Sequence, residues 1–401
     1  MHPRSWRGPV AALLVVSGAA GADPSVSPEE LRRLEESLGT VPAPAGPPAE
    51  TPPPAGSLTN PEIAAILDVA GAYYSTPEPL PAGGHDPAAT GFAFQQLELA
   101  LGAAADPYLR FDGNLVFGPS GVEVEEAYAT TLALPANLQL RAGQFLSRFG
   151  RINPTHPHRW SFVDLPIAAG RYLGPEGSRG IGVEGAWLAP LPWFAEVIVA
   201  AQGPGEAHLH DHDGEEEPAG EHGVEDLGDL VYTVALKQFF PLGEDVGLLF
   251  GVSTQQGPDP LAPGGRSSLL GADLHLRYRP VASTDRAALT LQLEGFRRVG
   301  REEGETLRDH GGYAQLVWSI DPAWETGVRY EWVSGLANEH LAPAEFGARR
   351  RAAAQLTHYP SHFSRLRLQV NRDDPLYRTK AFWAAFLQLE VTVGAHGSHA
   401  Y

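Results

Sequence analysis

Apolar and polar positions alternate with a period of two from about residue 62 to the end of the chain. In the segment 107–117, Leu109, Phe111 and Leu115 fall on one face, and charged or amide side chains fall between them. Similar segments of about ten residues recur between turns rich in Gly, Pro, Asn and Asp. A soluble β-sandwich would alternate as well. The polar face, however, carries charged and amide groups in segment after segment, which favours a barrel with a polar lumen and a lipid-facing exterior.

The connections between these segments differ at their two ends. Links after even-numbered segments are tight, as at 105–107, 135–137 and 189–192, whereas most links after odd-numbered segments are longer, as at 146–179, 202–228 and 299–309. This asymmetry is typical of an outer-membrane barrel. The sequence therefore predicts an all-β fold, a transmembrane antiparallel β-barrel of about 16 strands, which is wide enough for an aqueous channel. The segments begin near Glu62, Phe92, Tyr108, Val122, Leu138, Gly180, Phe194, Asp229, Asp245, Ser267, Arg286, His310, Trp324, Arg350, Ser364 and Arg378.

The N-terminal part of the chain has a different pattern. Residues 1–22 resemble a signal peptide, with a basic start, a short apolar run and a small-x-small cleavage pattern that ends at Ala22. Residues 23–61 predict a short helix that begins at Ser27, followed by a linker with seven prolines. We therefore expect a signal peptide, a periplasmic helix with its linker, and an outer-membrane barrel over 62–401, with both mature termini in the periplasm.

Composition and charge narrow the function classes. The chain has no cysteine, which excludes disulfides, a cysteine nucleophile and iron–sulfur clusters. Asp and Glu outnumber Lys and Arg by 48 to 29, so the formal net charge is −19. A field of this sign argues against nucleic-acid binding and favours cationic partners. The common hydrolase motifs are absent from the sequence, so we expect no enzyme activity and no required cofactor.

Several stretches resemble one family of Gram-negative outer-membrane proteins. They are residues 121–128, 140–153, the closing residues 394–401 and above all the run 156–166, which contains His-Pro-His-x-Trp. Members of this family are often labelled zinc-regulated TonB-dependent outer-membrane receptors, and they are similar to phosphate-selective porins. The resemblance implies an outer-membrane location. The motif residues are His156, His158, Trp160 and Asp164.

The receptor and porin labels imply different barrels. TonB-dependent receptors have 22 strands and a plug domain that fills the lumen. The 39 residues of the segment 23–61 are too few for such a plug. The sequence therefore fits a porin better than a plugged receptor.

The loop 202–228 carries candidate metal ligands. It holds four His and nine carboxylates, and no Lys or Arg occurs from 180 to 236. Imidazole and carboxylate are the ligands that Zn²⁺, Cu²⁺ or Ni²⁺ accept when thiolate is absent. A solvated acidic surface is the alternative, but His at every second position favours transient cation capture. The candidate ligands are His208, His210, His212, His222, Asp211 and Asp213.

A second cluster has the opposite sign. The loop 146–179 is the longest, and charged residues on a long loop folded into a pore set its selectivity. Arginines of this region could face glutamates of the segment that starts near Val122; pairing of these arginines with the barrel wall is equally open. We expect His156 and His158 to fix this loop by hydrogen bonds rather than to bind metal. The candidate constriction residues are Arg141, Arg148, Arg151, Arg159, Glu123 and Glu125.

Taken together, these patterns predict an outer-membrane porin-like channel for small solutes, linked to zinc or another divalent metal through the loop 202–228. The alternatives are a TonB-dependent metal receptor, an anion porin of the phosphate type, a barrel enzyme and a surface adhesin. The expected partners are the lipid bilayer and divalent metal ions or small solutes. Assembly as a homotrimer stays open.

Overall fold

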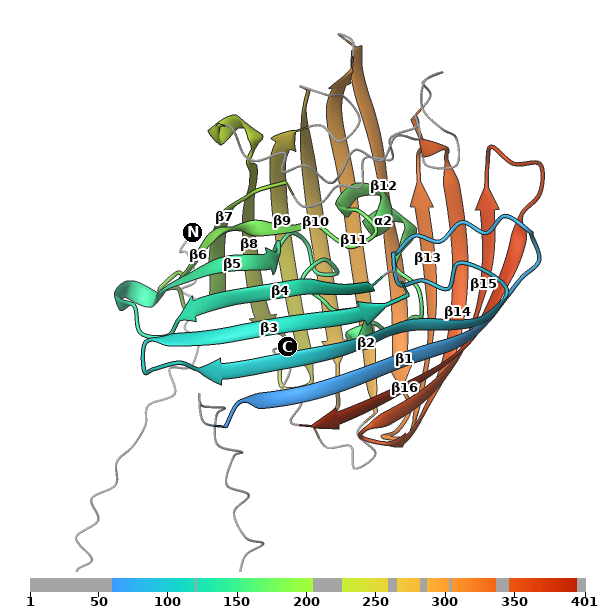
Figure 1. Ribbon diagram of the computed structural model, residues 1–401, viewed down its shortest axis with the longest axis horizontal. Helices are drawn as coiled ribbons and strands as arrows, with labels where there is room; N and C mark the ends of the chain where they lie inside the picture. Colours follow the sequence, from blue (N-terminus) through green and yellow to red (C-terminus); the bar gives the residue numbers. More distant parts are fainter. Residues whose placement is uncertain are drawn as a thin grey trace, which may run out of the picture. The chain divides into compact units, whose positions relative to one another are not determined.

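The alternating segments form one closed antiparallel β-barrel (Figure 1). In this computed structural model, each of the 16 strands of the described residues pairs with its neighbours in sequence, and β1 pairs with β16. The predicted fold class and strand number are therefore confirmed. The described residues are 60–119, 121–204, 226–258, 265–281, 287–302, 305–336 and 346–394.

The described elements follow one another with few helices between the strands. They are β1 (Glu62–Tyr74), β2 (Gly91–Ala104), β3 (Leu109–Gly118), β4 (Gly121–Thr131), η1 (Pro135–Asn137), β5 (Leu138–Leu146), η2 (Pro157–Arg159), α2 (Ile167–Leu173), β6 (Arg179–Leu188), β7 (Phe194–Gln202), η3 (Leu227–Asp229), β8 (Val231–Pro241), β9 (Val246–Pro258), β10 (Arg266–Tyr278), β11 (Ala288–Glu302), β12 (Glu305–Ser319), β13 (Trp324–Val333), β14 (Arg349–Ser361), β15 (Ser364–Pro375) and β16 (Phe382–Gly394).

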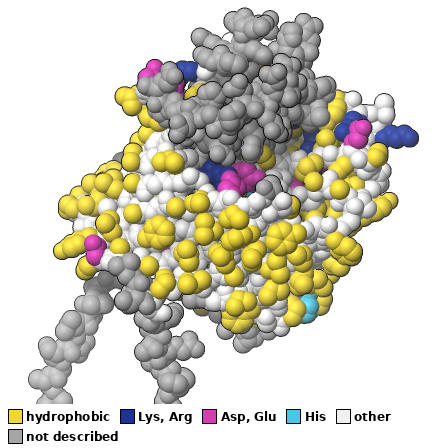
Figure 2. Space-filling view, in the orientation of Figure 1, with side chains coloured by type: hydrophobic (Ala, Val, Ile, Leu, Met, Phe, Trp, Pro, Cys, Tyr) yellow, Lys and Arg dark blue, Asp and Glu magenta, His cyan; other side chains and the backbone are white. Residues whose placement is uncertain are grey.

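The strands place apolar side chains outside and polar ones inside. On β16, Leu387 and Leu389 are 50% and 42% exposed, whereas Gln388 and Glu390 are 4% and 8% exposed. On the face in Figure 2, hydrophobic side chains form a broad band over the strands, and few charged side chains lie within it. A polar interior and an apolar outer face suit a barrel surrounded by lipid, in which every backbone group is paired within the sheet.

The helices of the described residues are short. None of them is long and apolar enough to cross a bilayer.

One predicted connection is wrong. The longer loop expected at 299–309 is a hairpin, because β11 continues to Glu302 and β12 begins at Glu305. At the base of this hairpin, Arg298 on β11 forms a double hydrogen bond with Asp309 on β12 at 3.0 and 2.8 Å. The polar residue Asp309, which falls inside the expected loop, is thus matched across two paired strands.

Two connections fold into the lumen. The first, residues 75–90, joins β1 to β2; the second, residues 147–178, joins β5 to β6 and contains α2. We call the second one the lumen loop. Its Phe149 and Tyr172 stack against Phe296 of β11, with ring centroids 6.2 and 5.5 Å apart, and α2 lies against β11, β12 and β13. The loop therefore has an apolar core of its own inside the barrel.

The two inward connections also contact each other closely. A Cβ atom placed on Gly170 of α2 would lie 2.3 Å from the carbonyl oxygen of Ala82. Only glycine allows this approach. The lumen loop is thus held on the other inward connection as well as on the barrel wall.

The predicted signal peptide, helix and linker lie outside the described residues, except for the final residues of the linker. These assignments stay predictions.

Candidate functional site in the barrel lumen

The lumen loop contacts two walls of opposite charge. Its motif residues lie between carboxylates on β2 and β4 and arginines on β13, β14 and β15. We call Glu98, Glu125 and Glu126 the acidic cluster. We call the second set the arginine wall, and it consists of Arg329, Arg349, Arg351, Arg365 and Arg367.

Asp164 fastens the lumen loop to the β13–β15 side. Its carboxylate accepts hydrogen bonds from Arg329 at 2.6 Å and Arg351 at 2.8 Å, and from Gln369 and Asn371 at 2.6 Å each. Burial alone would raise the pKa of Asp164, but the two guanidinium groups outweigh it and lower this pKa below its usual range. Asp164 is therefore a buried carboxylate that stays ionised.

Backbone groups of the same segment add to this attachment. The carbonyl oxygen of Trp160 accepts from Arg367 at 2.9 Å, and the N–H of Val163 donates to Gln369 at 2.6 Å. The N–H of Ile167, the first residue of α2, donates to Glu331 at 2.5 Å. The segment 160–167 is thus fixed along three neighbouring strands.

The two motif histidines contact the acidic cluster. Nδ1 of His156 lies 3.0 Å from Glu125, and its Nε2 lies 2.9 Å from Glu126. Nδ1 of His158 lies 2.9 Å from Glu98. The rings are stacked, with centroids 5.8 Å apart.

The surroundings of His156 favour a positive charge. Burial opposes its protonation, but the charges of Glu125 and Glu98 outweigh burial and raise the pKa of His156 well above its usual range. The acidic cluster therefore favours a proton on the ring of His156.

The candidate constriction arginines divide into two groups. Arg141 and Arg148 each lie 2.9 Å from Glu184 of β6, and Arg148 also lies 3.2 Å from Glu196 of β7. For these two residues, the alternative of pairing with the barrel wall describes the structure. Arg159 is half-buried in the lumen loop.

The remaining candidates have other partners. Glu123 forms an ion pair with Arg179, and Glu125 contacts His156. Arg151 is half-buried, and its backbone N–H donates to Glu294 at 2.9 Å. The glutamates of β4 therefore face His156 and Arg179 rather than Arg141 and Arg148.

The arginine wall and Glu98 were not predicted from the sequence. A signal was present for the arginines, because Arg349 and Arg351, like Arg365 and Arg367, recur at every second position of one strand face. Glu98 carried no comparable signal.

The proposed metal ligands of the loop 202–228 lie outside the described residues. They are His208, His210, His212, His222, Asp211 and Asp213.

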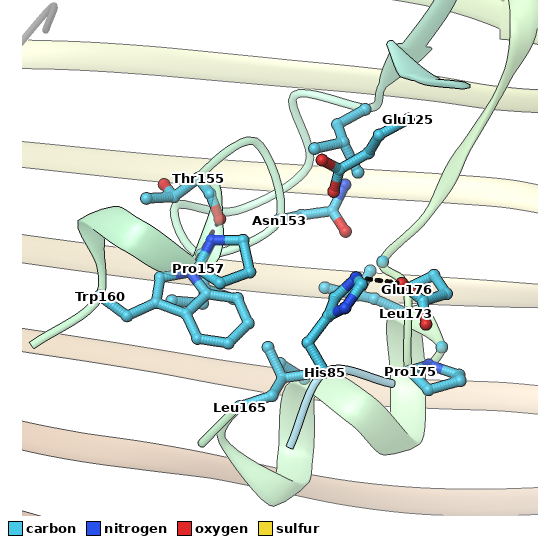
Figure 3. Close-up of a pocket in the computed structure, with 15 residues that line it drawn as sticks. His85, Glu125, Asn153, Thr155, Pro157, Trp160, Leu165, Leu173, Pro175 and Glu176 are labelled. Carbon is cyan, nitrogen blue, oxygen red and sulfur yellow. Dashed lines mark hydrogen bonds and ion pairs between the residues drawn. The ribbon is translucent and has the colours of Figure 1, made fainter. Parts of the chain in front are cut away.

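A small pocket of about 30 Å³ lies between the two inward connections. In Figure 3, His85 of the first connection points to Glu176 of the lumen loop, and their side chains lie 3.1 Å apart. Trp160 lies on one side of the pocket, and Glu125 of the acidic cluster lies on its wall. The pocket therefore gives access to the acidic cluster.

The sequence of this chain is similar to that of a known protein. An uncharacterized protein of Aquifex aeolicus is 31% identical over an alignment of 350 residues. The match covers 78% of this chain and 70% of that protein. The chain belongs to the same family as this Aquifex protein. No protein-family model matches the sequence.

Several solved outer-membrane structures have similar folds. OprB of Pseudomonas putida has a TM-score of 0.56 and 10% identity, over 83% of this chain and 94% of that one. The channel DcaP of Acinetobacter baumannii has a TM-score of 0.53 and 12% identity, over 84% of this chain and 99% of that one. An anion-selective porin from Comamonas acidovorans has a TM-score of 0.52 and 11% identity, over 83% of this chain and 99% of that one. These similarities confirm a porin-type barrel fold; zinc regulation and TonB dependence stay proposals.

Proposed function

We propose that this protein is an outer-membrane, porin-like channel for small solutes. The observation that carries the proposal is the lumen loop, which is folded inside a barrel with an apolar exterior and is fixed there through buried Asp164. A long loop held in the lumen narrows a pore, and the charged groups beside it select the solute. The 16 strands of the described residues support a porin over a 22-stranded receptor.

The charges in the lumen favour a cation over a phosphate-type anion. Four members of the arginine wall form ion pairs with Asp164, Glu331, Asp373 and Glu390. Their positive charge is therefore largely neutralised. The acidic cluster brings three buried carboxylates together beside two imidazoles and near Arg159, an arrangement that suits a cation. We infer that the solutes include divalent metal ions, gathered at the mouth by the loop 202–228.

Bilayer recordings test the channel and its selectivity separately. The purified full-length protein in a planar bilayer should give open steps, and a salt gradient should give a reversal potential of cationic sign. A silent barrel would contradict the channel, and an anionic reversal potential would contradict the cation preference. Replacing the four loop histidines by alanine should weaken zinc accumulation by cells without changing the conductance. Unchanged accumulation would remove the metal link of this loop.

The outer-membrane location belongs to the same proposal. It rests on the apolar outer face of the barrel and on the signal-peptide pattern of the sequence. Protease added to intact cells should cut within 202–228 and spare the turn at 189–192. Cleavage of the turn with protection of the loop would reverse this orientation.

A further inference from the structure

We propose that His156, His158, Glu98 and Glu125 form a buried site for one divalent metal ion of the zinc type. The ion would tie the lumen loop to β2 and β4. This site is separate from the loop 202–228, and it does not depend on which solute crosses the barrel. Its role is structural, because its ligands come from two wall strands and from the loop that lies between the walls.

The positions of the ligand atoms fit such an ion. One ligand atom each of Glu98, Glu125 and His156 lies within 4.8 Å of the others. Nδ1 of His156 is 3.0 Å from Glu125 and 3.9 Å from Glu98, and Nδ1 of His158 is 2.9 Å from Glu98. Zinc bonds of about 2.0–2.2 Å place neighbouring tetrahedral ligands about 3.3–3.6 Å apart. The separations among Glu98, Glu125 and His156 bracket this range, so small shifts of these side chains suffice. His158, which contacts Glu98 but lies outside this group of three, must turn towards the ion to join them.

The surroundings of His156 have the arrangement that a metal-ligating histidine needs. While Nδ1 faces Glu98 and Glu125, Nε2 lies 2.9 Å from Glu126. The other oxygen of Glu126 accepts the backbone N–H of Leu146 at 2.8 Å, which fixes the carboxylate. A carboxylate on the second ring nitrogen selects the tautomer and orients the ring for the metal.

Burial makes a cation at this place necessary. Glu98, Glu125, Glu126 and His158 are all less than a tenth exposed, and buried carboxylates are costly without a compensating cation. A divalent ion supplies this positive charge and also binds the carboxylate oxygens directly. The alternative to the metal is a proton on His156, and the two states differ in a measurable way.

The ligand set also has a route from solvent. Glu125 belongs to the wall of the pocket between the two inward connections. An ion that enters this pocket reaches the ligand atoms without opening the β-sheet. Access of this kind is one requirement for a metal site that loads after folding.

Zinc titration of the purified, folded full-length barrel tests the site. After treatment with a chelator, the protein should take up one tightly bound Zn²⁺ per chain, measured by calorimetry and by elemental analysis after gel filtration. Co²⁺ in its place should give the absorption of a tetrahedral N/O site. The double variant Glu98→Gln/His156→Ala should lose this ion, whereas replacing the four loop histidines should not. Absence of tight binding in the wild type, or its retention in the double variant, would overturn the proposal.

Two further measurements guard against a folding defect in the double variant. Glu126→Gln keeps all four ligands, so it should keep the stoichiometry and weaken the affinity about 10–100-fold; an unchanged affinity would contradict the role of Glu126. His358→Ala, a histidine next to Trp324 at a short turn, should bind like the wild type. In the wild type itself, Zn²⁺ should slow proteolysis of the lumen loop relative to chelator, and equal rates would contradict a structural ion.

Discussion

The lumen loop is attached at its two sides by different chemistry. On the arginine wall, Asp164 faces guanidinium groups that stay charged at any physiological pH, and Gln369 and Asn371 complete its hydrogen bonds. On the acidic cluster, the partners are imidazoles, and the charge of His156 depends on a proton. One side is therefore a permanent ionic attachment, whereas the proposed metal site would make the other side exchangeable.

This difference also decides where the lumen can select solutes. The arginine wall uses its charge to hold the loop, because Arg349 and Arg351 share Asp373 and Arg351 also binds Asp164. Glu125 of the acidic cluster lies beside the pocket. Under the proposed function, a pore that is basic in composition on one side can still favour cations.

Removal of the Asp164 carboxylate should give the largest effect. Asp164→Ala leaves Arg329 and Arg351 partly uncompensated in a buried place, which costs about 3–5 kcal/mol. We expect the loop to detach from β13–β15, so trypsin should cut it in the folded barrel and the conductance should rise. Asp374→Ala, which follows Asp373 on β15, is the control variant. Equal protease protection in Asp164→Ala and wild type would mean that the acidic side alone holds the loop.

Loss of the ion pairs of Glu184 should have a smaller effect on stability. Glu184→Gln takes the carboxylate from Arg141 and Arg148, while Arg148 retains Glu196. Because both arginines are partly exposed, we expect a loss of about 1–2 kcal/mol in unfolding free energy. The freed positive charge should shift the reversal potential towards anions. An unchanged potential would show that these arginines lie outside the solute path, which would confine selectivity to the acidic cluster.

The strands could be predicted from the sequence because the alternation is a local property. β15 and β16, for example, show the period of two within their own residues, so such strands can be counted without tertiary contacts. The hairpin at Glu302 was missed for the same reason, since the polar residues near it are matched only across the pair Arg298–Asp309. Local polarity alone cannot distinguish a loop from a paired polar strand.

The contacts of the site could not be predicted in this way. The motif run 156–166 was recognised, but Asp164 is separated by 165 residues from Arg329 and by 187 from Arg351. Glu98 is likewise 60 residues from His158. These pairs form because the barrel closes with one register and the loop folds inward, and neither step has a local sequence signal. We expected His156 and His158 to form hydrogen bonds rather than to bind metal because the sequence did not show that carboxylates lie beside them.

A titrating group outside the acidic cluster should also make the stability of the protein depend on pH. Asp86 of the first inward connection accepts N–H groups of Ala82, Gly83 and Leu165 at 2.8–3.0 Å. Burial, assisted by the nearby charge of Asp164, raises its pKa to about 6. The folded state then binds a proton more tightly than the unfolded chain.

Stability due to Asp86 should therefore fall as the pH rises from about 4 to about 6 and stay level above that, with a total change of at most about 3 kcal/mol. Asp86→Asn removes the titrating group, so its stability should lack this part of the pH dependence, even though the amide is a poorer acceptor for the three N–H groups. Asp106→Asn, at an exposed turn where the carboxylate accepts the N–H groups of Tyr108 and Leu109, should keep the wild-type profile. Thermal unfolding of the three proteins between pH 4 and 7 measures the difference. If the stability of Asp86→Asn and of the wild type depends on pH in the same way, Asp86 does not contribute to this dependence. The titrating proton then belongs to the acidic cluster alone, and the attachment of the lumen loop to the arginine wall is independent of pH in this range.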